Sequence, residues 1–383
     1  MKMPLPALFA AIALAAIAGG ADAAPTNKGP VAMDDLPLKP ARELRYEVSR
    51  GTFMSLAISP DGGTIAFDVL GDLYVMPAAG GRARPIAIGM AFEVQPTFSP
   101  DGKWIAYVSD RSGGDNVWIA RTDGSGARRI TDEDEGAVRL SPEWSADGRS
   151  IFVSRHRIRL NHYELWRHPI DPAEKAELVA PIRASAATPR SAWQSTLGAA
   201  ASRDGKWLYF ARANDLSFDE PVAWRIMRRN LATGAEEVVI GSSGGREAGS
   251  ESFFRPAISP DGRLLAYATR RMAGTWLRVR DLTTGIDRDL GPAPLDLSNA
   301  AAWLDLIPRY TFTPDGKAIL IAYQGQIERR PLDGAPVTRI PFTAPLRLAV
   351  GPSTRVRIRE ETGPVRAKLP QGTSPSPDGH AVA

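Results

Sequence analysis

The stretch that decides the fold is QPTFSPDGKWIAYVSDRSGGDNVWIARTDGSGARRITD, residues 95–132. A short strand ends at the turn signal Ser99-Pro100-Asp101-Gly102, and its apolar residues predict a second strand over 104–110. Glycine-rich connections then lead to a third and a fourth strand, predicted over 117–122 and 128–131. Four antiparallel strands that cannot bury their faces alone are expected to stack as one blade of a β-propeller.

The same tetrapeptide, or a close variant, recurs along the chain. The copies begin at Ser59, Ser99, Ser145, Ser202, Ser259, Thr313 and Ser376. In a type I turn proline presets φ at the second position, Asp tolerates the third, and Gly accepts a positive φ at the fourth. One such tetrapeptide is a weak signal, but repetition at this spacing is typical of a propeller. The predicted fold class is all-β, a propeller of four-stranded antiparallel blades with six blades legible and the start of a seventh.

Two features of the repeats need interpretation. The variants SADG at Ser145 and SRDG at Ser202 lack the proline, and we expect weaker turns there without a change in the blade count. An aromatic residue also recurs in the third strand, where it could stack a sugar or a base, or pack between neighbouring blades. Because it recurs at one strand position, packing is the expected role. Its members are Tyr74, Trp118, Trp166, Trp224 and Trp276.

The N-terminus predicts export. Lys2, an apolar run and Ala21-Asp22-Ala23 form a secretory signal peptide over residues 1–23. The apolar run is shorter than the ~20 residues that a membrane span needs, so no span is expected after leader removal. The predicted location is periplasmic or secreted. The predicted domains are an N-terminal segment with the strand that leads into the propeller at 24–50, the propeller at 51–347, and extra strands with a truncated start of a further blade at 348–383.

Composition excludes several classes of function. The chain has no cysteine, so a disulfide framework, a thiol nucleophile and a thiolate metal site are absent. The 47 basic and 43 acidic residues are interspersed, which predicts a mixed surface and no nucleic-acid partner. No sequence pattern assembles a nucleophile, a base and an orienting acid, or a metal-ligand set. We therefore predict no catalytic, cofactor-binding or metal-binding residue in this chain.

The candidate binding residues lie on one face of the predicted disc. The tetrapeptide turns share a face with the turns between third and fourth strands. The opposite face carries the hairpins between second and third strands and the connections between blades, and these are the longer loops. Their length suggests a partner-binding face, or insertions that are merely tolerated, and both interpretations stay open. The candidates are Arg111, Asp115, Asn116, Arg157, His162, Asp219, Glu220, Arg246 and Glu247.

The repeats resemble the TolB-type propeller with its WD40-like PD40 repeats, found in periplasmic translocation proteins, tricorn-like proteases and prolyl-oligopeptidase-type serine peptidases. More narrowly, residues 51–81, 89–125 and 363–379 are similar to the N-terminal propeller of large secreted amidohydrolases. That resemblance implies a catalytic domain outside this chain, in which a divalent metal such as zinc acts on C–N bonds of cyclic amides or dipeptide-like substrates. None of its metal ligands is present here, and no cofactor is expected in this chain.

Three functions are compatible with these residues. The first is the non-catalytic propeller portion of a secreted amidohydrolase-type protein, which gates substrate or packs on its own C-terminal catalytic domain. The second is a stand-alone periplasmic TolB-like propeller that binds another protein or a peptide. The third is the propeller of a prolyl-oligopeptidase-like serine peptidase. Because the last turn, at Ser376, is followed by only a few residues, we expect the chain to stop inside an unfinished blade.

Overall fold

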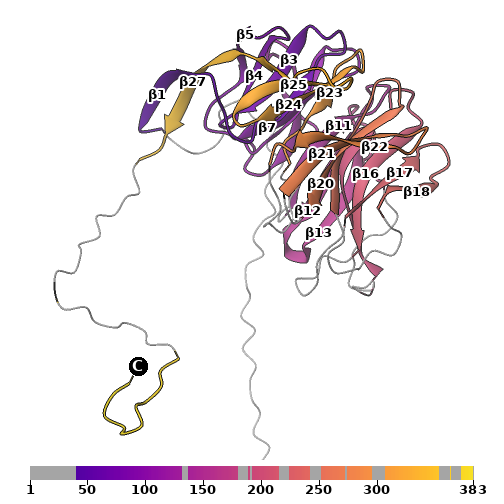
Figure 1. The fold of residues 1–383 in the computed structure, drawn as a ribbon. Coiled ribbons are helices and arrows are strands. Elements are labelled where there is room, and N and C mark those ends of the chain that lie inside the picture. Colours follow the sequence, from indigo (N-terminus) through magenta and orange to yellow (C-terminus); the bar gives the residue numbers. More distant parts are fainter. Residues whose placement is uncertain are drawn as a thin grey trace, which may run out of the picture.

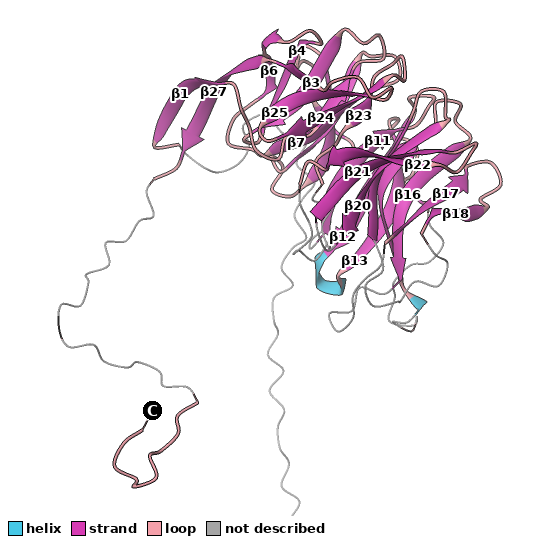
Figure 2. Cartoon of the chain, in the orientation of Figure 1, coloured by secondary structure: helices cyan, strands magenta, loops and turns pink. Residues whose placement is uncertain are grey.

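The computed structural model describes residues 40–131, 137–179, 189, 192–214, 224–241, 252–271, 274–295, 307–352, 363 and 372–382. Within these residues the chain forms six four-stranded antiparallel sheets and one three-stranded sheet (Figure 1). Strands dominate throughout, and the helical structure includes one short 3-10 turn at Ile158–Leu160 (Figure 2). The predicted all-β propeller of six four-stranded blades is confirmed.

Each blade is a continuous segment of chain whose strands follow one another outward. Blade 1 contains β2 (Leu56–Ile58), β3 (Thr64–Val69), β4 (Asp72–Pro77) and β6 (Arg84–Ala87). Blade 2 contains β7 (Glu93–Phe98), β8 (Trp104–Ser109), β9 (Asn116–Arg121) and β10 (Arg128–Arg129). Blade 3 contains β11 (Ala137–Trp144), β12 (Ser150–Arg157), β13 (His162–Pro169) and β14 (Glu177–Leu178). Blade 4 contains β15 (Gln194–Ala201), β16 (Trp207–Asn214), β17 (Arg225–Asn230) and β18 (Glu236–Ile240). Blade 5 contains β19 (Ser252–Ile258), β20 (Leu264–Arg271), β21 (Gly274–Asp281) and β22 (Asp287–Pro292). Blade 6 contains β23 (Thr311–Phe312), β24 (Ala318–Tyr323), β25 (Gln326–Pro331) and β26 (Thr338–Ile340).

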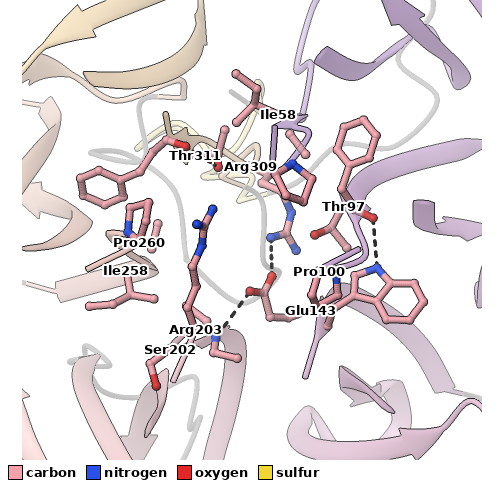
Figure 3. A pocket seen from close by; sticks show the side chains of 18 of the residues that line it. Ile58, Thr97, Pro100, Glu143, Ser202, Arg203, Ile258, Pro260, Arg309 and Thr311 are labelled. Atoms are coloured by element: carbon pink, nitrogen blue, oxygen red, sulfur yellow. Dashed lines mark hydrogen bonds and ion pairs between the residues drawn. The ribbon is translucent and has the colours of Figure 1, made fainter. Parts of the chain in front are cut away.

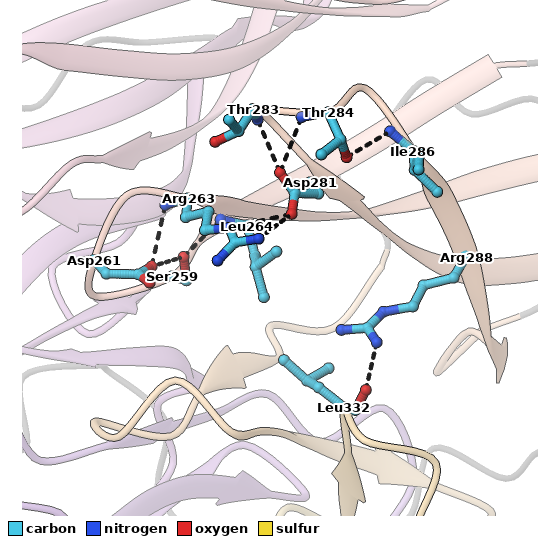
Figure 4. A network of polar contacts seen from close by, with 10 residues as sticks. All are labelled: Ser259, Asp261, Arg263, Leu264, Asp281, Thr283, Thr284, Ile286, Arg288 and Leu332. Carbon is cyan, nitrogen blue, oxygen red and sulfur yellow. Dashed lines mark hydrogen bonds and ion pairs between the residues drawn. The ribbon is translucent and has the colours of Figure 1, made fainter.

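The tetrapeptide turn is held by side chains as well as by backbone conformation. In blade 2, Ser99 Oγ donates to Asp101 Oδ1 (2.6 Å) and accepts the Trp104 N–H (3.0 Å), while Asp101 Oδ1 accepts the Lys103 N–H (3.1 Å). The same three bonds occur at all seven copies, and Figure 4 shows those of blade 5. The hydroxyl of the first turn residue, Thr313 in blade 6 and serine elsewhere, holds the pKa of each turn aspartate below its ordinary value.

These bonds explain why the proline can vary. Gly102 has a φ of 71°, as predicted for the fourth position. Gly148 and Gly205, in the two variant turns, both have 69°. The serine-to-aspartate distance is 2.6 Å in each variant turn, the same as in blade 2. The variants therefore keep the geometry of the other turns, because Ser, Asp and Gly supply the contacts and proline supplies none of them.

The core lies between the blades. The residue eight positions after the first turn residue is completely buried in every blade; these residues are Phe67, Tyr107, Val153, Phe210, Tyr267 and Ile321. Clusters of buried apolar side chains join each blade to the next. One such cluster combines Leu320 and Ile327 of blade 6 with Leu56 of blade 1, and Figure 1 shows these two blades side by side. The ring is therefore closed with six blades.

The predicted row of aromatic residues is only partly correct. The residues paired with the buried positions are Tyr74, Trp118, Trp166, Met227, Arg278 and Glu328. Trp224 precedes β17 by one residue, and Trp276 lies two residues before its expected position. Tyr74, Trp118 and Trp224 are buried as expected of packing residues, whereas Trp166 and Trp276 are partly exposed. The row fails in blades 4 and 5 because the register is set by the turn serine, not by the aromatic residue.

A separate sheet joins the two ends of the ring. After blade 6 the chain continues as β27 (Phe342–Val350), which crosses to blade 1, pairs in parallel with β5 (Gly81–Arg82) and pairs antiparallel with β1 (Arg42–Val48). The Phe342 ring packs edge-on against Phe67 of blade 1 with centroids 5.1 Å apart. β27 thus continues across residue 347, where the propeller was predicted to end.

The seventh turn lies outside the ring. The turn at Ser376 has the same hydrogen bonds as the others, and one bridge pairs Pro375 with Val382. Every residue from 372 to 382 except Ser376 is exposed. Because six blades already complete the ring, this hairpin is not one of its blades. Of the segment 348–383, in which extra strands were predicted, residues 353–362 and 364–371 lie outside the described residues.

Candidate functional site

The innermost strands of the six blades surround a channel of about 320 Å³. Residues of every blade line it, and Figure 3 shows their side chains converging on one space. The end of the channel at the tetrapeptide turns, which we call the turn face, is lined by the second turn residue of each blade. These residues are Pro60, Pro100, Ala146, Arg203, Pro260 and Pro314. The walls are therefore largely apolar at this end, with one guanidinium among them.

A polar ring is built from one position of the repeat, and two of its six members, Arg255 and Arg309, line the channel. Four residues before the first turn residue, the six blades place Ser55, Gln95, Ser141, Gly198, Arg255 and Arg309. In blades 2 to 5 the strand pairing shifts next to this position. The φ values there are positive, at 58° for Gln95, 53° for Ser141 and 50° for Arg255. A bulge of this kind changes the direction of the side chain and frees a backbone N–H from the ladder.

Hydrogen bonds connect this polar ring from blade to blade. The Asp68 carboxylate accepts the N–H groups of Ser55 (3.2 Å) and Gln95 (2.9 Å). Gln95 Oε1 accepts the Ser141 N–H (2.6 Å), and Arg255 Nη1 donates to Ser141 Oγ (2.6 Å). Burial raises the pKa of Asp68 to about 7, although its two N–H donors oppose that shift. The freed N–H groups of Gln95 and Ser141 are satisfied by the preceding blade, which links neighbouring blades.

The channel is lined by more basic than acidic side chains. Three arginines, Arg203, Arg255 and Arg309, line it together with one carboxylate, Glu143. Arg309 Nη1 lies 2.8 Å from Glu143 Oε2, and Arg309 Nη2 donates to the Pro142 carbonyl. The Ala201 N–H donates to the other Glu143 oxygen (3.4 Å). Arg203 is exposed, and in Figure 3 its guanidinium extends into the cavity. The channel can therefore attract an anion electrostatically.

The predicted candidates of blade 2 stabilise their own hairpin. Arg111 is 1% exposed, forms an ion pair with Glu93 and lies over the Trp118 ring at 5.2 Å. Asn116 is also buried and accepts the Thr131 hydroxyl (2.7 Å). Asp115 is half-buried, and burial raises its pKa. All three lie at the β8–β9 hairpin, on the predicted loop face, but only Asp115 is partly accessible.

The other candidates are spread over further blades. Arg157 ends β12 and lies 3.7 Å from the Glu164 carboxylate. His162 begins β13, is buried, and packs edge-on against Trp193 with centroids 5.6 Å apart. Asp219, Glu220, Arg246 and Glu247 lie outside the described residues, as do most of the long loops. The structure brings none of the described candidates into the channel, and their role in binding stays a prediction.

The channel residues were missed because nothing in a single repeat marks them. The one signal was SRDG at Ser202, which replaces a proline by Arg203 and was interpreted as a weakened turn. Glu143 and Arg309 are distant in sequence, and only ring closure brings them together. Among the described residues, no group of three or more His, Asp or Glu is placed to hold a metal ion. The zinc site implied by the amidohydrolase resemblance would lie outside this chain.

Comparisons with known proteins agree with this architecture. Residues 53–215 match the family model of the tricorn protease N-terminal β-propeller domain. An uncharacterized protein of Agrobacterium fabrum is 32% identical over 125 residues, which are 32% of this chain and 40% of that protein. Tricorn protease homolog 1 of Streptomyces coelicolor is 27% identical over 280 residues, which are 64% of this chain and 26% of that protein. The chain thus spans well under half of each of these relatives.

A solved structure extends the likeness to the whole ring. Putative TolB from Agrobacterium tumefaciens superposes with a TM-score of 0.52 at 18% identity, covering 75% of this chain and 91% of that one. At this identity the likeness shows the fold alone. Together with the repeats and the closed ring of six blades, it defines a TolB-like β-propeller.

Proposed function

We propose that this chain is a non-catalytic propeller that binds a peptide or protein segment in its central channel. The observation that carries the proposal is the channel itself, to which all six blades contribute and in which three guanidiniums outnumber one carboxylate. Its concave shape and convergent polar groups beside proline side chains are features of a ligand site.

We further propose that the propeller is part of a longer secreted hydrolase, in which it gates substrate or packs on a catalytic domain. The matched region covers only 26% of the tricorn protease homolog, so a propeller of this type occurs as one part of a larger protein. The three stretches similar to amidohydrolase propellers favour a metal-dependent enzyme acting on C–N bonds. The leader at residues 1–23 favours export. No helix in the described ranges is long and apolar enough to cross a membrane.

A stand-alone TolB-like propeller that binds a periplasmic protein or peptide is the second candidate. The observation in its favour is that the solved TolB-like structure is covered to 91% by this chain. The coding frame beyond Ala383 separates the candidates. An H-x-H pair after a strand would support the amidohydrolase, G-x-S-x-G with later Asp and His would support a serine peptidase, and a stop codon would support the stand-alone protein.

The binding role itself is tested by selecting peptides with the purified chain from a random peptide library and mapping the bound region by hydrogen exchange. We expect protection of β7, β11, β19 and the turns at their ends, because these border the channel. Failure to select any peptide, or protection confined to the outer strands, would contradict the proposed function.

A further inference from the structure

The turn face carries a belt of contacts that is broken at one junction. At five junctions the turn glycine of one blade lies against the second turn residue of the preceding blade. A methyl group built on Gly102, for example, would lie 3.5 Å from Pro60 Cδ. The pairs are Gly62 with Pro314, Gly102 with Pro60, Gly148 with Pro100, Gly205 with Ala146, and Gly316 with Pro260. At the junction of blades 4 and 5, a methyl group built on Gly262 would have no atom within 4 Å beyond its own chain neighbours.

The break coincides with the one charged residue of the belt. The second turn residue of blade 4 is Arg203, whose side chain extends into the cavity instead of covering Gly262 (Figure 3). In the part of the chain that the structure describes, its guanidinium has neither a hydrogen bond nor an ion pair. An exposed arginine in a turn usually points away from the protein, because water solvates it best there. This one is placed over an opening.

Most of the turn aspartates have a basic residue beside them in the chain. Each turn contains an aspartate, but in five of the six blades a basic residue follows it two positions later: Lys103, Arg149, Lys206, Arg263 and Lys317. Inside the channel the Glu143 carboxylate is already paired with Arg309, and Arg255 is tied to Ser141. The channel lining therefore has a net positive charge, with three guanidiniums against one carboxylate, and Arg203 is its accessible part.

We propose that the turn-face mouth of the channel binds a carboxylate-bearing peptide segment, with Arg203 as the anchoring cation. This inference rests on the proposed binding function and names its ligand class. A guanidinium binds a carboxylate through two parallel hydrogen bonds, and the proline and isoleucine walls suit the apolar atoms of a peptide. The cavity is at the small end of the range for ligand sites, so it admits a short extended segment. Arg309 supplies a second cation when the ligand replaces Glu143.

The test compares two probes on the full chain by fluorescence anisotropy. One is a labelled acetyl-Ala-Glu-Leu-Glu-Ala-amide peptide, and the other is the same peptide with Gln in place of Glu. We expect the acidic peptide to bind at least about tenfold more tightly, as removal of a charge-assisted pair predicts. Equal affinity for both peptides would overturn the ligand class while leaving the binding function intact. Displacement by an equal concentration of inorganic phosphate would show an unspecific anion site and overturn the peptide assignment.

Variants locate the site. Arg203→Ala should weaken binding about tenfold, and Arg203→Pro should do the same while restoring the contact with Gly262 that the other blades make. Arg203→Pro also controls for folding, because its melting temperature should equal or exceed that of the wild type. Arg149→Ala, at an exposed turn arginine outside the channel lining, should leave affinity unchanged. Glu143→Gln should raise affinity, because it removes the carboxylate that competes with the ligand. Full affinity in both Arg203 variants would overturn the proposal, and weaker binding by Glu143→Gln would overturn the role of Arg309.

Discussion

The contribution of a turn serine hydroxyl to the free energy of unfolding can be estimated at Ser99. Ser99 is 3% exposed, and its Oγ takes part in two bonds of the turn, to Asp101 and from the Trp104 N–H. In Ser99→Ala the Trp104 N–H loses its acceptor at the partly buried start of β8. An unsatisfied group of this kind costs about 1–3 kcal/mol, which corresponds to a fall in melting temperature of roughly 2–5 °C in a domain of this size.

Two variants make that experiment specific. Ser99→Thr should melt close to the wild type, because Thr313 already makes the same bonds in blade 6 at 2.6 and 3.1 Å. Ser376→Ala removes the same hydroxyl from the turn outside the ring and should leave the melting temperature unchanged. Differential scanning calorimetry of the three variants measures the effect. A Ser99→Ala protein as stable as the wild type, or a Ser99→Thr protein as unstable as Ser99→Ala, would refute the reasoning.

The remaining predictions concern pH, a strained turn and catalysis. Burial raises the pKa of Asp68 and Asp72 to about 7, so the stability that their protonated forms contribute is present below about pH 4 and is lost as the pH rises to 7. Asp68→Asn should therefore flatten the dependence of melting temperature on pH across that window, and a curve parallel to the wild type would argue against it. Leu70 is half exposed with a φ of 54° in a two-residue turn. Leu70→Asn should raise the stability by roughly 0.5–1 kcal/mol, since Asn accepts that conformation, and a lower melting temperature would contradict this. The purified chain should hydrolyse neither amides, dipeptides nor cyclic ureides, even with added zinc. Turnover that stays with the chain through successive purification steps would disprove this.

Local chemistry made the blade predictable. Ser, Asp and Gly each have one conformational or hydrogen-bonding role in the turn, so the turn, its positive φ and the strands on either side follow from four residues. The strands predicted in blade 2 were found within three residues of their expected bounds. The aromatic row was less reliable, since large apolar residues can move by two or three positions in a strand and still reach a neighbouring blade.

The channel was not predictable in the same way. Its polar ring depends on bulges at Gln95, Ser141 and Arg255, residues that rarely adopt a positive φ and carry no sequence signal for it. Glu143 and Arg309 meet only because six blades complete one turn of the ring. Arg203 was visible in the sequence as a departure from the repeat. Its meaning appeared only when the structure placed it beside an uncovered glycine.

The pairing of β1 with β27 determines how the propeller responds to tension between its ends. Arg42 lies opposite Val350 and Val48 opposite Ala344, so the chain enters and leaves at the same end of this ladder. A pulling force would therefore separate the two strands one residue pair at a time, starting at Arg42, rather than slide them past each other. Seven pairs would give way in sequence at low force before any blade was loaded. The force would then reach Phe342, whose removal from blade 1 would uncover Phe67 at the junction that closes the ring.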